Sequence, residues 1–154
     1  GVDRSSDDIY DVLNRLAASL PADNDGLACE PLFRGSRRAP RATGTFTGVT
    51  PANFTPGHVA RAVVRGIVDG FYSFYDEAGD ARPAHLARII GSGNGLRKNP
   101  LLVAELARRF ERPVFVPAHE EEAAFGAALL AGVQTGLWAS LPAAGEVIRL
   151  KQVA

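Results

Sequence analysis

The apolar residues of this chain recur with two periods, one typical of helices and one typical of strands. Spacings of three and four residues predict a helix after the cap Ser6-Asp7-Asp8 and a longer helix after Thr55-Pro56. The apolar positions of these two helices are Ile9, Val12, Leu13, Leu16 and Leu20, then Val59, Ala62, Val63, Ile67, Phe71 and Phe74. Shorter extended segments are expected between them, at 27–33 and 45–47.

The second half of the chain alternates between the two periods. We expect a strand near 86–90, a helix near 99–110, a short strand at 114–116 and an alanine-rich helix at 120–134. This order of strands and helices favours an α/β fold whose sheet has parallel neighbours. Residues 146–153 fit either a strand or a trailing arm, and the pattern leaves both open.

Length and charge narrow the class of protein. A chain of 154 residues suits one domain with a sizeable core. Its 17 basic and 17 acidic residues cancel, which argues against a nucleic-acid partner and a polybasic membrane surface. With Cys29 as the single cysteine no internal disulfide can form, so a reducing, cytoplasmic setting is expected. The polar, acidic start and the lack of methionine suggest a fragment of a longer chain.

The segment between the strand near 86–90 and the next helix carries three glycines, Gly91, Gly93 and Gly95. Glycine lets a ligand approach the main chain without a Cβ in the way, and a helix start favours negative charge. Asn94 and Asn99 add amide groups that can read the edge of an adenine. The loop alone is equally compatible with a simple tight turn.

Two better-known nucleotide loops do not fit this segment. A Walker loop needs Gly-Lys-Ser/Thr at a fixed spacing, which is missing. The dinucleotide fingerprint needs a glycine where Leu96 stands, and an acid after the second strand, where Pro117-Ala118-His119 follows instead.

Two further units admit structural explanations. The small residues of 120–128 predict a helix that packs closely on the sheet, and its three adjacent glutamates point in different directions, which argues against a metal site. Gly44 and Gly48 frame a turn that leads to the long helix. His58 in the first turn of that helix is expected to make a structural contact, since no acidic partner stands at a helpful spacing.

Taken together, these units resemble the C-terminal part of the FGGY carbohydrate kinases. The resemblance covers nearly all of residues 6–136 and is closest to the sedoheptulokinase-like branch. Its four parts are a Gly-Glu-Arg-x-x-Pro-like loop at 35–40, the glycine–aromatic–glycine turn and helix at 44–65, an adenosine loop at 91–94, and a Glu-Ala-Ala-x-Gly-Ala-Ala helix at 122–128.

The resemblance implies part of an actin-like, ribonuclease H-like ATPase domain, with residues 1–154 forming a partial C-terminal nucleotide-binding domain and the N-terminal sugar-binding domain absent. It implies transfer of a phosphoryl group from ATP, with Mg²⁺, to a sugar that is a ketose or polyol, sedoheptulose being one candidate. The adenosine contacts implied are Gly91, Ser92, Gly93, Asn94 and Asn99. No residue here matches the family's catalytic aspartate, so the fragment alone is expected to be inactive.

The implied partners are the sugar and the remainder of the kinase chain, with no nucleic acid and no membrane, and a homodimer is compatible. Two positions depart from the family pattern: Ser36 replaces a glutamate, and Arg65 replaces an acidic residue. These departures keep a non-catalytic, kinase-derived interaction domain open as an alternative. A different α/β nucleotide binder, such as a Rossmann-type dehydrogenase domain, is the other.

Overall fold

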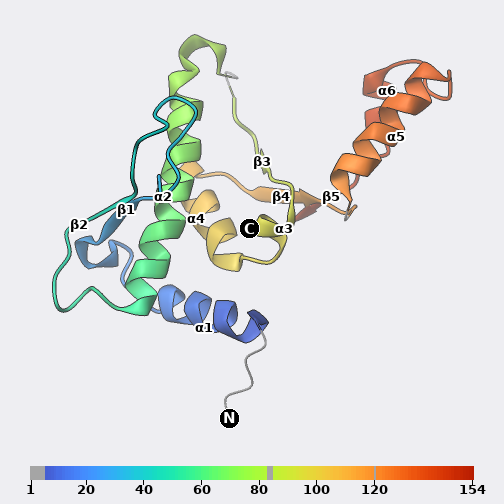
Figure 1. Cartoon of the computed structure of the whole chain (residues 1–154). Helices are drawn as coiled ribbons and strands as arrows, with labels where there is room; N and C mark the ends of the chain where they lie inside the picture. The colour runs from blue at the N-terminus through green and yellow to red at the C-terminus, as the bar shows by residue number, and fades with distance from the viewer. Residues whose placement is uncertain (1–5, 83–84, 120) are drawn as a thin grey trace.

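The computed structural model describes residues 6–82, 85–119 and 121–154. Helices and strands alternate through most of the chain (Figure 1). In chain order they are α1 (Ser6–Ala18), β1 (Ala28–Glu30), β2 (Thr45–Thr47), α2 (Pro56–Glu77), β3 (Ile89–Ile90), α3 (Asn94–Arg97), α4 (Pro100–Phe110), β4 (Val114–Pro117), α5 (Glu122–Gln134), α6 (Leu141–Gly145) and β5 (Leu150–Gln152), with single 3₁₀ turns at Asn24–Gly26 and Gly79–Ala81.

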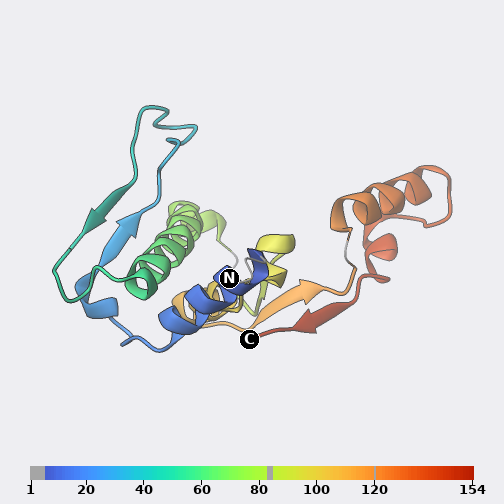
Figure 2. The same cartoon turned by 60° about the horizontal axis from the view of Figure 1, so that its bottom comes forward.

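The long helix α2 is the centre of the molecule. Thr55 precedes it in an extended conformation and Pro56 occupies its first turn, as the sequence predicted. Its Ala62 packs with Leu27 and Cys29 of the β1 side, and its Val68 packs with Val103 and other apolar residues of the α4 side. One helix therefore joins two small cores, with the β1–β2 hairpin on one side and α4 on the other (Figure 2).

A three-stranded sheet in the order β3-β4-β5 carries the second half of the chain. β3 and β4 are parallel, with Ile89 opposite Val114, and α3 and α4 form the crossover between them. β5 runs antiparallel to β4, with Phe115 opposite Gln152. The expected parallel α/β arrangement is thus confirmed for β3 and β4, and the undecided segment 146–153 contains a strand.

Helices α5 and α6 form an arm that extends away from α2 and α4 (Figures 1 and 2). Within the arm the Trp138 ring lies where a Cβ on Gly132 would be, so these two residues pack without a gap. The predicted packing of the small-residue face on the sheet is wrong for this chain, because a Cβ on Gly126 would meet nothing within 4 Å. Leu130, Leu137 and Leu141 are exposed.

Several predicted boundaries shift. The strand expected at 86–90 is reduced to Ile89–Ile90, and the helix expected from 120 begins at Glu122, with Glu120 outside the described residues. The glycine segment is not a continuous loop, because α3 begins at Asn94. In the part of the chain that the structure describes, no helix combines the length and the apolar character needed to cross a bilayer.

Candidate functional site

The three glycines that follow β3 have different surroundings. The Gly91 N–H donates to the Phe115 carbonyl at 2.9 Å and so extends the pairing of β3 with β4. A Cβ on Gly91 would lie 2.5 Å from a methyl carbon of Leu96, so this glycine allows α3 to fold back onto the strand. Gly91 therefore has a packing role whatever the loop binds.

Gly93 and Gly95 present open main chain. A Cβ on either residue would meet nothing within 4 Å. Gly93 has φ +93°, a conformation that side chains of L-residues rarely adopt, and it stands at the N-terminus of α3. Ser92 between the first two glycines is exposed. At Gly93 and Gly95 the main chain is thus not covered by side chains, whereas Gly91 is covered by Leu96.

A hollow of about 640 Å³ lies against this segment, between it and α1. Its lining consists of Tyr10, Asp11 and Asn14 from α1 and of Asn94, Gly95, Lys98 and Asn99. The fold therefore brings the two predicted asparagines to one hollow, whereas Gly91, Ser92 and Gly93 are not among its lining residues. Lys98 is the single cation and Asp11 the single anion in this lining.

The amide oxygen of Asn99 already makes a hydrogen bond within the protein. Its Oδ1 accepts a hydrogen bond from the Leu102 N–H at 3.0 Å, which caps the start of α4. The Nδ2 group remains to donate to a ligand. The sequence suggested that Asn99 lies near the edge of an adenine, and the capping role was not predicted. Asn-Pro at a helix start is itself a capping signal.

The α1 wall of the hollow was missed from the sequence. Tyr10 and Asn14 are four residues apart and lie on one face of the helix, next to Asp11. They stand about eighty residues before the glycine segment, and no local spacing connects the two. The sequence showed only the helical spacing of the apolar residues in this segment.

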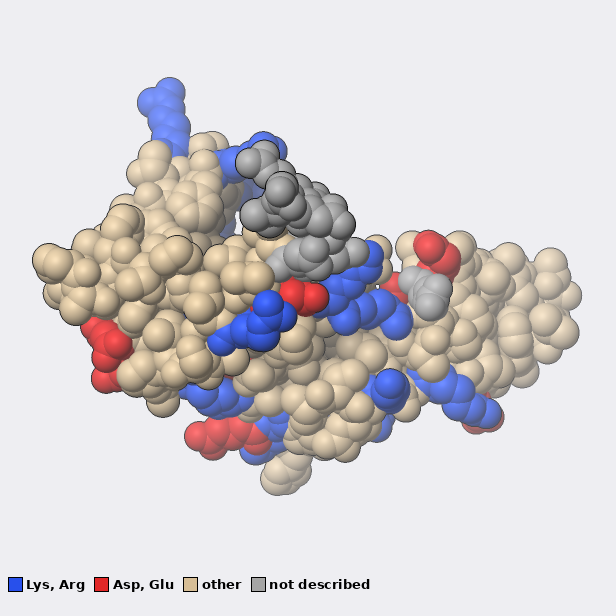
Figure 3. All heavy atoms as spheres, turned by 90° about the horizontal axis from the view of Figure 1, so that it is seen from below, with Lys and Arg blue, Asp and Glu red and all other residues tan. Residues whose placement is uncertain are grey.

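Metal ligands do not gather anywhere among the residues that the structure describes, where no three His, Cys, Asp or Glu side chains meet. Glu122 instead pairs with Arg97, with 2.6 Å between Oε1 and Nη2. Viewed from below, acidic and basic side chains are interspersed with uncharged surface (Figure 3).

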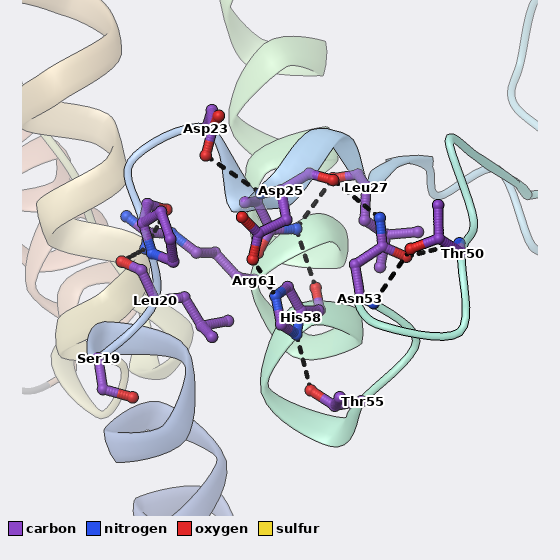
Figure 4. Close-up of polar contacts among 12 residues, drawn as sticks. Ser19, Leu20, Asp23, Asp25, Leu27, Thr50, Asn53, Thr55, His58 and Arg61 are labelled. Atoms are coloured by element: carbon purple, nitrogen blue, oxygen red, sulfur yellow. Dashed lines mark hydrogen bonds and ion pairs between the residues drawn. The ribbon is translucent and has the colours of Figure 1, made fainter.

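A separate polar cluster holds the start of α2, and it corrects the expectation that His58 has no acidic partner. Figure 4 shows His58 between two groups: its Nε2 lies 2.9 Å from Oδ2 of Asp25, and its Nδ1 lies 2.7 Å from the Thr55 hydroxyl. Asn53 beside it donates to the carbonyls of Asp25 and Gly48. His58 is buried, so its role is the structural one that the sequence predicted.

Arg65, one of the two departures from the family pattern, belongs to a buried ion cluster between α2 and α4. Glu105 accepts hydrogen bonds from Arg61 at 3.0 Å, Arg65 at 3.2 Å and Arg108 at 2.7 Å. Burial raises the pKa of the Glu105 carboxyl, but the hydrogen bonds and charges of the three arginines outweigh burial and leave the pKa below its ordinary value. The carboxyl is therefore charged at neutral pH.

Ser36, the other departure, closes a turn. Its N–H donates to the Ala39 carbonyl and its hydroxyl accepts from the Ala39 N–H, both at 3.0 Å. Neither departure lines the hollow beside the glycine segment.

Comparison with known proteins identifies relatives along most of the chain. Residues 2–135 match the C-terminal domain of the FGGY family of carbohydrate kinases. Sedoheptulokinase from Mus musculus is 35% identical over 104 residues, which are 68% of this chain and 21% of that protein. Glycerol kinase from Trichlorobacter lovleyi is 36% identical over 143 residues, 90% of this chain and 27% of that protein.

Solved structures agree with this match. Xylulose kinase from Rhodospirillum rubrum superposes with a TM-score of 0.77 at 29% identity, over 97% of this chain and 30% of that one. Plasmodium falciparum glycerol kinase with ADP superposes with a TM-score of 0.68 at 23% identity, over 92% of this chain and 27% of that one, and so shows the fold alone.

The relatives differ in substrate, so the similarity does not favour the predicted sedoheptulokinase branch. The chain spans between a fifth and a third of the length of these relatives. The match to the FGGY C-terminal domain also leaves the Rossmann alternative without support. The chain belongs to the FGGY family of carbohydrate kinases and has the actin-like ATPase fold of its C-terminal lobe.

Proposed function

We propose that this chain forms the adenosine-binding side of a carbohydrate kinase that transfers the γ-phosphoryl group of ATP to a sugar hydroxyl. The observation that carries the proposal is the hollow of about 640 Å³ beside open main chain at Gly93 and Gly95. Family membership supports it, as does a fold shared with a glycerol kinase that was solved with ADP. Residues 1–154 then form part of a C-terminal nucleotide-binding domain, and an N-terminal domain outside them binds the sugar.

In this proposal the nucleoside lies between α1 and the glycine segment. Asn94 lines the hollow itself, and Gly91, Ser92 and Gly93, which do not line it, are assigned the main chain that leads into it. The Asn99 Nδ2 group donates to a ring nitrogen of adenine. Tyr10 on the opposite wall offers an aromatic face for the base.

The polar residues of the same hollow suit the rest of the nucleotide. The Asp11 carboxylate can accept hydrogen bonds from ribose hydroxyls, and Lys98 carries a positive charge toward the phosphates. These contacts bind the part of ATP that does not react. Binding energy from such a remote part can be used to hold the reacting phosphoryl group in line with the acceptor.

No three ligand side chains meet among the residues that the structure describes, so a Mg²⁺ held by this chain alone is not proposed. Neither catalysis nor metal binding is therefore assigned to a side chain of this chain. The general base and the phosphate contacts would come from the remainder of the kinase, and this chain would bind and orient the nucleotide. The acceptor is proposed to be a ketose or polyol, sedoheptulose among the candidates.

A non-catalytic interaction domain is the competing proposal, and Ser36 and Arg65 motivated it. Both residues make well-defined contacts within the fold, at Ala39 and at Glu105. These contacts account for both departures within the fold and away from the hollow, so the departures no longer favour the interaction domain over the kinase.

The test replaces Gly93 with valine in the full-length protein and measures ATP affinity by calorimetry. Gly136 is the matched control, because it also has a positive φ (+79°) and open space around it, but lies beyond α5. Both valines strain the backbone, each by roughly 1–3 kcal/mol, so melting curves of the two variants are compared alongside ATP affinity. We expect only Gly93→Val to weaken ATP binding, by tenfold or more. Equal ATP affinity in the two variants and the wild type would remove the assignment.

A further inference from the structure

Arg97, the last residue of α3, ties together three parts of the chain. Its Nη2 donates to the Pro117 carbonyl at 2.8 Å and also to the His119 carbonyl, in the turn that follows β4. The same guanidinium contacts the first residue of α5, with 3.1 Å from Nε and 2.6 Å from Nη2 to Oε1 of Glu122. One side chain thus fixes the end of α3, the β4–α5 turn and the start of α5.

The carboxylate that Arg97 binds also reaches the glycine segment. Oε1 of Glu122 accepts the Gly93 N–H at 3.4 Å, a long hydrogen bond to the glycine that directly precedes Asn94, which lines the hollow. The hydrogen bond from Arg97 lowers the pKa of the Glu122 carboxyl, so its charge persists at neutral pH. Glu122 is therefore the link between α5 and the conformation of Gly93.

This ion pair differs from a typical surface pair. The Arg97 and Glu122 side chains are only 19% and 23% exposed, whereas Asp69 in the pair with Arg109 is 60% exposed. Arg97 also donates hydrogen bonds to two main-chain carbonyls, and both carbonyls would lose a hydrogen bond if the guanidinium were removed. Exposed ion pairs contribute little to stability. A partly buried pair whose guanidinium donates to several acceptors is expected to keep its side chains in one arrangement.

The turn that Arg97 contacts is also packed on α5. The His119 ring stacks on the Phe125 ring of α5, with 3.8 Å between centroids and 19° between planes. A shift of α5 would therefore carry His119 and Glu122 together, and both are bonded to Arg97. Among the described residues, Arg97 and Glu122 thus connect α5 to Gly93 by hydrogen bonds.

We propose that Arg97 and Glu122 are positioning residues for the nucleotide, and that they couple the shape of the glycine segment to the placement of α5. The inference rests on the proposed function, since it assumes that this segment binds adenosine. It follows by linkage that nucleotide and a fixed α5 stabilise each other to the same extent.

The experiment compares Arg97→Gln, Glu122→Gln and the double variant with wild type in the full-length protein. Arg109→Gln is the matched control, because it also removes a guanidinium bonded to a carboxylate at 2.7 Å, but on the α2–α4 face. Calorimetry with ADP gives Kd, steady-state kinetics separate KM for ATP from kcat, and a melting curve reports stability. Hydrogen exchange of α5 is followed with and without ADP.

Arg97→Gln should raise the Kd for ADP and the KM for ATP about tenfold, with kcat and the sugar KM within about twofold of wild type. Glu122→Gln should also raise the Kd for ADP and the KM for ATP. The double variant should raise them no further than the more severe single variant, because either change breaks the Arg97–Glu122 ion pair. ADP should slow exchange at the start of α5 in wild type and not in Arg97→Gln.

Wild-type protein that binds no ADP would overturn the proposed function and this inference with it. Wild-type protein that binds ADP, together with variants whose Kd stays within twofold, would overturn the inference alone. The inference alone would also be overturned if Arg109→Gln lost as much ADP affinity as Arg97→Gln and the two variants showed the same fall in melting temperature. If Arg97→Gln does not fold, Glu122→Gln decides, because glutamine keeps the shape of the side chain and removes the charge that pairs with Arg97.

Discussion

Replacing Glu105 with glutamine should destabilise this protein more than any exposed ion-pair change. Glu105 is 3% exposed, and two of its partners, Arg61 and Arg65, are 11% and 17% exposed. Glutamine keeps the shape but leaves these guanidinium groups without a counter-charge in a poorly hydrated site. Removing one partner of a buried pair costs about 3–5 kcal/mol, and the half-exposed Arg108 brings the expected value toward the lower end, about 3 kcal/mol.

The position of Arg61 makes the effect extend beyond α2 and α4. Its Nη1 donates to the carbonyls of Ala17 at 3.3 Å, Leu20 at 2.7 Å and Pro21 at 3.1 Å, at the C-terminal end of α1. Urea unfolding followed by circular dichroism measures the loss. With a slope of about 2 kcal/mol per molar urea, a loss of about 3 kcal/mol lowers the midpoint by about 1.5 M.

The pH dependence of the same variant provides a second readout. Because the folded pKa of Glu105 lies below its ordinary value of 4.5, the charged carboxyl stabilises the fold above that value, and this stability is lost as the pH falls through the folded pKa. The difference between wild type and Glu105→Gln should stay constant from pH 7 to about 5 and shrink at lower pH.

Asp69→Asn is the control, since the Asp69–Arg109 pair is largely exposed and should contribute at most about 1 kcal/mol. The reasoning fails if Glu105→Gln costs no more than Asp69→Asn, or if the gap to wild type widens in acid.

Two further predictions concern single asparagines. Asn99→Asp keeps the acceptor that caps α4 and removes the Nδ2 donor, so ATP affinity should fall while the melting temperature stays unchanged. Asn99→Ala removes the cap as well and should also lose about 1 kcal/mol of stability. An Asn99→Asp variant with wild-type ATP affinity would exclude Asn99 from the adenine contact. Asn53→Ala strands the Asp25 and Gly48 carbonyls and the Thr50 N–H, which Asn53 bonds at 2.8–2.9 Å, and should cost about 2–3 kcal/mol in thermal unfolding; a loss below 1 kcal/mol would mean that water replaces the side chain.

The elements that were predictable from the sequence are those whose signal is local. The helix at 56–77 has a proline at its start and an apolar face that repeats over about four turns. Both features can be read from this segment of the sequence alone. α3 was missed because four residues, one of them glycine, carry no periodicity and poor helix propensity. The antiparallel pairing of β5 with β4 joins residues about 35 positions apart, which a local pattern does not encode.

The candidate site also contains residues that a local pattern predicts and residues that it does not. Asn94 and Asn99 stand beside the glycines in sequence, so their spacing alone suggested a shared ligand. Tyr10 and Asp11 reach the same hollow only because α1 packs across α2 and lies near the start of α4. The Asp25–His58 contact likewise depends on a left-handed turn at Asp25 (φ +48°), an uncommon conformation for a non-glycine residue.

The departure at Arg65 is best understood as part of helix packing. Its Nε lies 3.2 Å from Oε2 of a buried glutamate on α4, and its Nη2 donates to the Ala22 carbonyl in the loop after α1. A carboxylate at position 65 would instead face Glu105 across the same contact, and two buried like charges at that distance are strongly unfavourable. The residue types at 65 and 105 therefore constrain each other. Because neither lines the hollow beside the glycine segment, this exchange of charge leaves the lining of the hollow unchanged.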